Sequence, residues 1–182
     1  MQIPHLETCL PRLLRFPHSM LIEDDLARIA LQEEQLQFPS FNEATAWSLG
    51  TRLRYLADNR GLSVVIDVRR FGQPLFYTAL PGTSPDNVDW VRRKSNVTAR
   101  FLCSSYSLGL TLQQKMSNIT QEYGLPHSDY ATHGGCFPIS VESAGVIGSV
   151  TVSGLPQRAD HELVVEALCG ELGLDYQSLR LS

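Results

Sequence analysis

Apolar residues recur at helical spacing in five parts of the chain, which predicts five helices. The predicted helices cover residues 22–35, 43–59, 85–101, 107–119 and 158–172. Asn42 precedes the second helix and is placed to cap it. In the third helix, the spacing of Val88, Val91, Ser95 and Leu102 predicts the side that faces the core.

Between the helices, runs rich in β-branched residues predict strands. A first pair covers residues 62–69 and 75–79, and a second pair lies within residues 136–140 and 145–153. A short turn separates the two members of each pair, so each pair is predicted to form a β-hairpin.

The order of these elements predicts an α/β protein of the α+β type. Because short turns join the neighbouring strands, the sheet should be largely antiparallel, with the helices packed against it. Residues 36–41 predict at most an edge strand, since Pro39 cannot donate a ladder hydrogen bond. Residues 1–20 contain three prolines and predict an irregular arm before a single domain over residues 21–182. Residues 120–135 are also predicted to be irregular.

The composition excludes several classes of function. The 182 residues are 43% hydrophobic and 19% charged with a formal net charge of -4, so no basic surface for nucleic acid is expected. No run approaches the ~18 apolar residues that cross a membrane. Cys9, Cys103, Cys136 and Cys169 stand singly, which argues against a zinc site and a disulfide scaffold. We therefore expect a cytoplasmic protein with no metal site and no nucleic-acid or membrane partner.

His133, Gly134 and Gly135 lead into the second predicted hairpin. His133 is a candidate acid, base or axial metal ligand, because histidine titrates near neutral pH. The alternative is a loop histidine that donates to a backbone carbonyl. The two glycines either expose N–H groups to an anion or only permit a backbone conformation that other residues avoid.

Trp90 and Lys94 are four residues apart, so they share one face of the third predicted helix. In one interpretation they form a pocket wall, where Trp90 stacks on a flat ligand and Lys94 meets its carboxylate. In the other, Trp90 packs in the core while Lys94 reaches past it to water.

Three further segments hold candidate residues. Ser104, Ser105 and Tyr106 follow the third helix, where their hydroxyls either cap the next helix or contact a ligand. A nucleophile pair of Ser105 with His133 lacks both a G-x-S-x-G elbow and a third member. Arg158 stands at the start of the last helix, where it could reach an anion bound by the helix end.

Other residues of these segments have simpler interpretations. Asp160 is predicted to be a first-turn anion of the last helix and His161 its solvated partner. Cys136 is predicted to point into the sheet as a small buried hydrophobe.

Four segments together resemble a known family. They cover residues 87–94, 104–106, 130–139 and 145–161, and include a Gly-Gly-x-x-Pro-Ile run and a Gly-x-Ile-Gly-x-Val-x-Val-Ser-Gly run. They are similar to the HbpS/GlcG-like superfamily, also described as a haem-degrading domain, in a branch known as an uncharacterised protein family. The resemblance implies a profilin-like fold with a five-stranded antiparallel sheet flanked by helices, and homo-oligomeric assembly.

The resemblance implies a small-molecule binding protein, and haem or another flat anionic molecule is the ligand and cofactor it points to. The expected pocket lies near Gly134 and Gly135 and is lined by Trp90, Lys94, Tyr106 and His133. The alternative is a non-catalytic oligomeric adaptor that acts through protein–protein interfaces. The resemblance supplies no catalytic residues and leaves open whether the protein is an enzyme.

Overall fold

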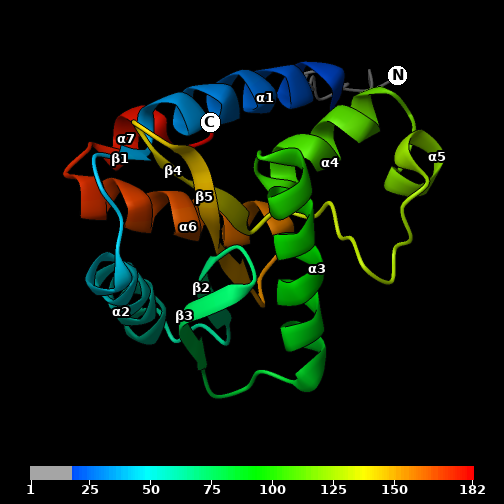
Figure 1. Cartoon of the computed structure of the whole chain (residues 1–182). Helices are drawn as coiled ribbons and strands as arrows, with labels where there is room; N and C mark the ends of the chain where they lie inside the picture. Colours follow the sequence, from blue (N-terminus) through cyan, green and yellow to red (C-terminus); the bar gives the residue numbers. More distant parts are fainter. Residues whose placement is uncertain (1–17) are drawn as a thin grey trace, which may run out of the picture.

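The computed structural model describes residues 18–182, with side chains from residue 21 onward. Its strands are β1 (Gln37–Phe38), β2 (Val65–Arg70), β3 (Gln73–Ala79), β4 (Cys136–Val141) and β5 (Gly145–Ser153). Its helices are α1 (His18–Gln35), α2 (Glu43–Asn59), α3 (Pro85–Phe101), α4 (Ser105–Gln114), α5 (Ile119–Tyr123), α6 (Gln157–Leu172) and α7 (Tyr176–Leu179). Figure 1 shows the helices packed around one central sheet.

The sheet has five strands in the order β1-β4-β5-β2-β3, which confirms the predicted α/β fold. Three of the four neighbouring pairs are antiparallel, as the hairpins predict. The pair β1–β4 is parallel, with Gln37 opposite Ser140, so the sheet is not antiparallel throughout. No hairpin joins these two strands. Because they lie far apart along the chain, tertiary packing determines whether they run parallel or antiparallel.

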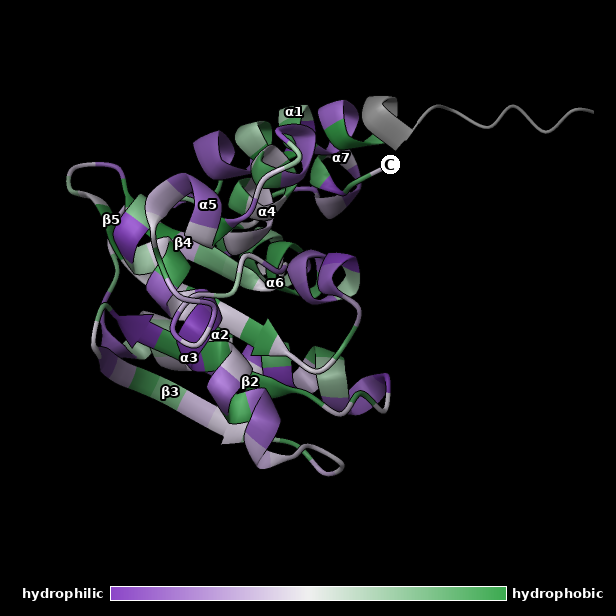
Figure 2. Ribbon diagram, turned by 90° about the vertical axis from the view of Figure 1, so that its right-hand side faces the viewer, coloured by the Kyte–Doolittle hydropathy of each residue, from purple (hydrophilic) through white to green (hydrophobic). Residues whose placement is uncertain are grey.

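One face of the sheet carries the main hydrophobic core. Side chains alternate between the two faces of a strand, and those facing the core are Ile66, Val68, Phe137, Ile139, Val150 and Val152. Helices α2 and α6 cover this face with Leu49, Leu53, Leu163, Val164 and Leu168. The alternation is visible in Figure 2, where the strands change between green and purple along their length.

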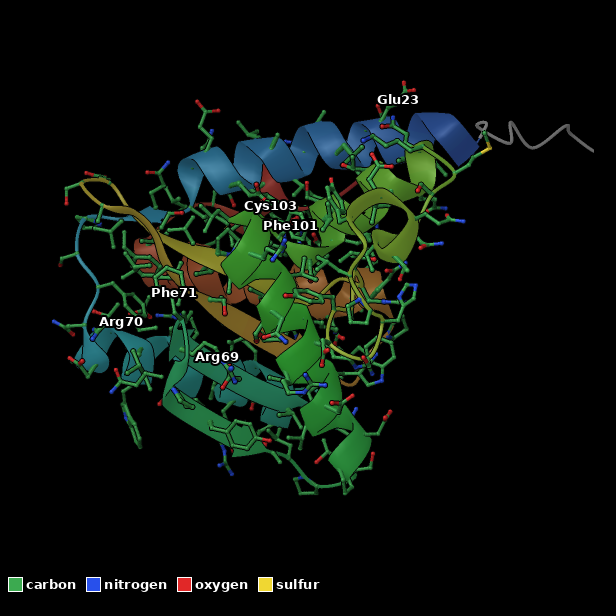
Figure 3. All side chains as sticks on the ribbon, turned by 45° about the vertical axis from the view of Figure 1, so that its right-hand side comes forward. Glu23, Arg69, Arg70, Phe71, Phe101 and Cys103 are labelled. Carbon is green, nitrogen blue, oxygen red and sulfur yellow. The ribbon has the colours of Figure 1, made fainter. Side chains whose placement is uncertain are left out.

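The opposite face of the sheet is polar and is covered by α3. The Ser95 and Thr151 hydroxyls lie 3.1 Å apart, and the Thr151 hydroxyl donates to the Cys136 sulfur at 3.1 Å. Asp67 is fully buried here and accepts two hydrogen bonds from Arg69, which Figure 3 draws on the side that α3 covers. Helix α3 therefore packs on small polar groups, and Cys136 is buried as predicted.

The buried side of α3 differs from the prediction. Val88 and Leu102 were expected to face the core, but they are 45% and 53% exposed. Leu102 lies past the end of the helix in the left-handed conformation, at φ 57°, which turns it away from the helical stripe. Lys94 takes the place of an apolar residue in that stripe and is buried.

A smaller layer of α1, α4 and the C-terminal segment packs at one side of the sheet (Figure 1). Its apolar contacts are made by Ile22, Ile29, Tyr106, Leu110 and Leu181. The amide of Gln32 donates to the Leu179 carbonyl at 2.8 Å, and Glu33 accepts from the Ser104 N–H at 2.7 Å. These bonds attach α1 to both of its neighbours.

Element boundaries differ from the prediction in several places. The helix predicted over residues 107–119 is α4, which begins at Ser105 and ends at Gln114. Residues 18–20, expected in the irregular arm, belong to α1, while the rest of that predicted arm lies outside the described residues. The segment 120–135 was expected to be irregular but contains most of α5, which Asn118 caps through the N–H groups of Thr120 and Gln121. Helix α7 was not predicted, because four residues are too few for a periodic signal.

Candidate functional site

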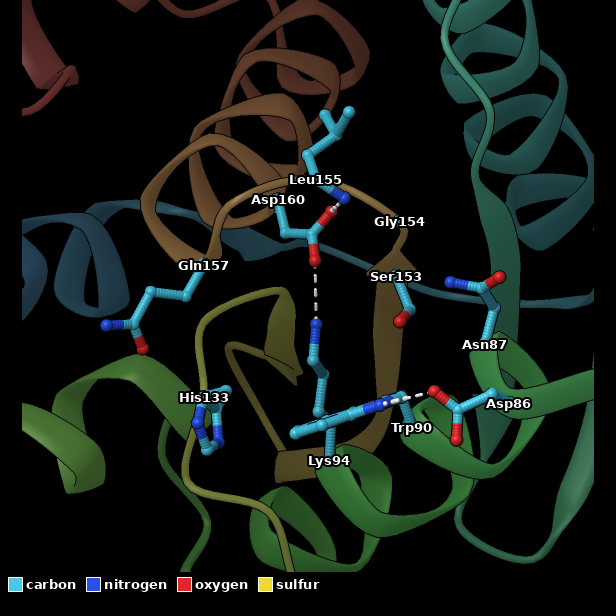
Figure 4. Close-up of a pocket in the computed structure, with 10 residues that line it drawn as sticks. All are labelled: Asp86, Asn87, Trp90, Lys94, His133, Ser153, Gly154, Leu155, Gln157 and Asp160. Carbon is cyan, nitrogen blue, oxygen red and sulfur yellow. Dashed lines mark hydrogen bonds and ion pairs between the residues drawn. The ribbon is translucent and has the colours of Figure 1, made fainter. Parts of the chain in front are cut away.

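A pocket of about 250 Å³ lies between the N-terminal half of α3 and the loop that joins β5 to α6. Figure 4 shows its lining side chains converging from these elements and from the segment that precedes β4. The lining residues are Asp86, Asn87, Trp90, Lys94, His133, Ser153, Gly154, Leu155, Gln157 and Asp160. The pocket thus brings together Trp90, Lys94 and His133, three of the residues that the sequence singled out.

Helix α3 forms one wall of the pocket, and local interactions fix where this helix begins. Pro85 occupies the first turn, and the N–H and hydroxyl of Ser84 donate to the Asn87 side-chain oxygen at 2.9 and 3.2 Å. One turn later, Trp90 donates its indole N–H to Asp86 at 3.0 Å. Lys94 follows four residues on, so both side chains reach the same pocket, as their spacing predicts.

Lys94 forms a buried ion pair with Asp160 at the floor of the pocket. The ammonium lies 2.8 Å from Asp160 Oδ2 and also donates to the Val152 carbonyl at 3.1 Å. The exposed fractions of the two side chains are 3% and 2%. Lys94 therefore does not reach past Trp90 to water, because Asp160 compensates its charge inside the protein.

Asp160 connects the ion pair to the loop before α6. Its Oδ1 accepts from the Leu155 N–H at 3.0 Å, so both carboxylate oxygens have donors. Burial raises the pKa of this carboxyl, while Lys94 and the backbone N–H groups of Leu155 and Gly154 oppose the rise. Asp160 lies in the first turn of α6, as predicted, and its carboxylate is in addition buried against Lys94 of α3.

His133 stands beside Trp90 at the side of the pocket. Their rings meet edge to face, with centroids 4.9 Å apart. Burial lowers the pKa of the imidazole below its ordinary value, and the charges of Lys94 and Arg93 lower it further. His133 is thus neutral at neutral pH. Its imidazole has no hydrogen-bond partner among the described residues, so the expected bond to a backbone carbonyl is absent.

Trp90 is less available for stacking than predicted. The guanidinium of Arg93 lies over its ring, 4.1 Å from the centroid, and is held by Asp89 at 2.7 Å. With His133 against the indole as well, Trp90 offers a ligand only the part that faces the pocket.

The glycines before β4 serve close packing. Gly135 has φ 121°, a conformation that side chains disfavour, and a Cβ there would come within 2.7 Å of the Lys94 ammonium. A Cβ on Gly134 would collide with the carbonyl oxygen of Gln157. Gly134 and Gly135 therefore let β4 approach α3 and α6, in line with the conformational interpretation.

Ser105 secures the same segment through its hydroxyl. It donates to the His133 carbonyl at 2.6 Å and accepts from the Cys136 N–H at 3.1 Å. The hydroxyl thus bonds to the backbone of His133, which removes the basis for a Ser105–His133 nucleophile pair. The helix cap of α4 is Ser104, whose hydroxyl accepts from the Ser107 N–H at 3.1 Å.

Tyr106 and Arg158, like Gly134, Gly135 and Ser105, do not line the pocket. Tyr106 is buried under α1, with its ring centroid 5.2 Å from that of His161. Arg158 forms an ion pair with Asp25 and donates to the Ser182 carbonyl at 2.7 Å, so it does not face an anion site at the end of α6. Both side chains attach α1 and the C-terminal segment to the domain.

His161 is fully buried, and its prediction as a solvated residue is wrong. Its Nε2 lies 2.8 Å from the side-chain oxygen of Gln32 on α1. Burial lowers its pKa to about 3, so the ring stays neutral over the physiological range. The helical pattern of α6 gave no sign that a second helix covers this position.

Ser153, Gln157 and Leu155 are site residues that the sequence reasoning missed. Ser153 ends β5 and is 4% exposed, yet its hydroxyl has no hydrogen-bond partner among the described residues. A serine at the end of a strand carries no sequence signal for a site. Their position next to the glycine that ends the second predicted hairpin was the sequence feature that could have indicated them as site residues.

The described residues contain neither a metal-binding cluster nor a membrane-spanning helix. In residues 18–182 no group of three histidine, cysteine or acidic side chains is placed to hold a metal ion. Within the same range no helix has both the length and the apolar character needed to cross a membrane.

Comparison with known proteins identifies the family. Residues 41–169, more than half of the chain, match the family model described as "Haem degrading protein HbpS-like". A UPF0303 protein from Acidobacterium capsulatum is 61% identical over 162 residues, which cover 89% of this chain and 98% of the relative.

Solved structures share the fold. The crystal structure of the Ybr137w protein has a TM-score of 0.75 and 25% identity, covering 87% of this chain and 99% of its own. The PduOC:heme complex has a TM-score of 0.62 and 13% identity, covering 75% and 98%. The second likeness is one of fold alone. The chain belongs to the HbpS-like family and is similar throughout most of its length to the UPF0303 proteins.

Proposed function

We propose that this protein binds a flat anionic small molecule at the pocket between α3 and α6, with haem as the candidate ligand and His133 as its axial ligand. The observation that carries the proposal is the exposed imidazole of His133, which lines the pocket beside Trp90 and has no hydrogen-bond partner among the described residues. A neutral imidazole nitrogen is a common ligand of haem iron.

The family and the structural neighbours support the choice of ligand. The family model is described as haem degrading, and the PduOC neighbour is a haem complex. The residues here fit such a group in part. His133 supplies a ligand atom, but about 250 Å³ is smaller than the ~300–1,000 Å³ of pockets that enclose a drug-sized ligand. The pocket would therefore enclose only part of a haem. Bound haem would supply iron chemistry that the described side chains lack.

Titration with haemin tests the proposal. The absorption of the Soret band should shift saturably and near one equivalent, and His133→Ala should abolish the shift. His127→Ala is the matched control, because His127 is an exposed histidine that does not line the pocket. An unsaturable shift, or one that His133→Ala leaves unchanged, removes His133 as the ligand.

We also propose that the chain self-associates, and an exposed aromatic surface on α2 favours this. Trp47 and Tyr55 are each 65% exposed and line a groove of about 460 Å³ with Thr51 and Arg52. Such surfaces commonly mark protein interfaces. Light scattering on the purified protein should give a mass above the 20.3 kDa of one chain. A clean monomer across micromolar concentrations contradicts self-association and, with it, the adaptor alternative in its oligomeric form.

The proposed location is the cytoplasm. The described cysteines Cys103, Cys136 and Cys169 are all free thiols, as expected in a reducing compartment. Fractionation of cells that express the full chain tests this.

A further inference from the structure

We propose that the floor of the pocket is a carboxylate-binding subsite formed by the Ser153 hydroxyl, the remaining N–H of Lys94 and the N-terminal end of α6. The inference rests on the proposed binding function and states which chemical group of the ligand enters first. The same chemistry is available from a propionate arm of haem and from a small free carboxylic acid.

The unsatisfied hydroxyl of Ser153 is the first observation. The residue is buried but its hydroxyl oxygen is open to the pocket, since the buried unpartnered polar atoms among the described residues are Thr98 Oγ1 and His161 Nδ1. Ser153 is 4% exposed and has no partner among the described residues, and Figure 4 shows its side chain pointing into the pocket. A ligand oxygen would satisfy it.

Lys94 provides the second donor. An ammonium group has three N–H bonds, and two of them go to Asp160 and the Val152 carbonyl. The third has no acceptor among the described residues, although the side chain is only 3% exposed and lines the same pocket. Each oxygen of Asp160 already accepts a hydrogen bond, one from Lys94 and one from the Leu155 N–H.

The end of α6 favours a negative charge at this point. Helix α6 has 16 residues, and Pro156 at its N-cap supplies no side-chain hydrogen bond. The backbone N–H groups of a helix start and the positive end of its dipole attract anions. Gln157, the first residue of α6, lines the pocket. Asp160 offsets the charge of Lys94, and Asp86 adds a carboxylate to the lining that is bonded to the Trp90 indole, so the helix end is what would favour an anion over a neutral carbonyl.

The size of the pocket limits what accompanies the carboxylate. At about 250 Å³ it holds a small planar body beside Trp90 and Leu155, or one arm of a larger molecule. Benzoate is a suitable probe, and benzamide has the same shape without the charge. We expect benzoate to shift the Trp90 indole N–H signal saturably in nitrogen–proton NMR spectra, with benzamide at least about tenfold weaker.

Ser153→Ala separates recognition from folding. Since the hydroxyl has no partner in the free protein, its removal should leave stability unchanged while weakening benzoate about ten- to hundredfold, the value of a hydrogen bond to a charged group. Ser149→Ala is the matched control, because Ser149 is a buried serine on the same face of β5 that does not line the pocket. Equal binding of benzamide and benzoate, or benzoate binding that Ser153→Ala leaves unchanged, overturns the carboxylate subsite.

Haemin and its dimethyl ester distinguish the two sources of the carboxylate. If the ester binds more weakly than haemin and Ser153→Ala affects haemin alone, the carboxylate is a propionate. If benzoate binds in the Ser153-dependent manner while haemin does not bind, the subsite stands and the haem proposal fails. If haemin and its ester bind equally, both depend on His133, and benzoate does not bind, the haem proposal stands and the subsite is refuted.

Discussion

The ion pair between Lys94 and Asp160 makes a quantitative prediction about stability. Lys94→Met keeps the length and apolar character of the side chain but leaves the Asp160 carboxylate, 2% exposed, without its counter-ion. Removing one partner of a buried pair typically costs about 3–5 kcal/mol. A domain of this size is stable by roughly 5–15 kcal/mol, so we expect the variant to fold with a large part of its stability lost.

The double variant Lys94→Met/Asp160→Asn isolates the charge. The asparagine oxygen can still accept from the Leu155 N–H, which now bonds to Asp160 Oδ1 at 3.0 Å. With neither charge present, we expect the double variant to be at least about 2 kcal/mol more stable than the sum of the single losses predicts.

Acid should reduce the loss in Lys94→Met. Burial already raises the pKa of Asp160, and loss of Lys94 raises it further. The folded variant therefore holds a proton that the unfolded chain releases above its own pKa, and its deficit relative to the wild type grows as pH rises.

Urea unfolding followed by far-ultraviolet circular dichroism at pH 5 and pH 8 measures these differences. A loss in Lys94→Met below about 1 kcal/mol at pH 8, or strictly additive single losses, would refute the reasoning that the pair is desolvated and coupled.

Three further predictions concern the stability of the folded protein. Burial holds the pKa of His161 at about 3 in the folded protein. The free energy of unfolding of the wild type should therefore fall by up to about 1.4 kcal/mol per pH unit as pH drops below the ordinary histidine pKa near 6.5. His161→Gln should lack this slope in urea titrations, and an unchanged slope contradicts the assignment. Gly135→Ala should lower the free energy of unfolding by about 1–3 kcal/mol, because φ is 121° and the new Cβ would collide with the Val152 carbonyl. Gly72→Ala is the control, because open space surrounds Gly72, and it should change thermal stability little. Asn42→Ala should cost about 1 kcal/mol, since Asn42 accepts from the Thr45 N–H at 3.0 Å; an unaltered midpoint in urea would exclude a role for the cap.

Local features of the chain were predictable because their causes are local. Asn42 caps α2, Pro85 stands in the first turn of α3, and both hairpins form where β-branched runs flank a turn. Trp90 and Lys94 reach one pocket because residues four apart share a helix face. The parallel direction of β1 was not predictable in this way, since its partner β4 lies about a hundred residues away along the chain.

The chemical state of the site residues depended on partners distant in sequence. Lys94 is paired instead of solvated because Asp160 meets it from α6, 66 positions later. His161 is buried because Gln32 of α1 packs over it. Ser153 is a candidate ligand contact only because α3 and α6 enclose its hydroxyl in one pocket.

The sequence by itself predicted five of the seven helices of the described residues, both hairpins, and the shared face of Trp90 and Lys94 on α3. These follow from periodicity, capping and turn chemistry, which act over a few residues. The tertiary structure alone decided which charges are buried, which are compensated, and which donors remain free for a ligand, because desolvation and pairing depend on surfaces that meet only when the chain is folded.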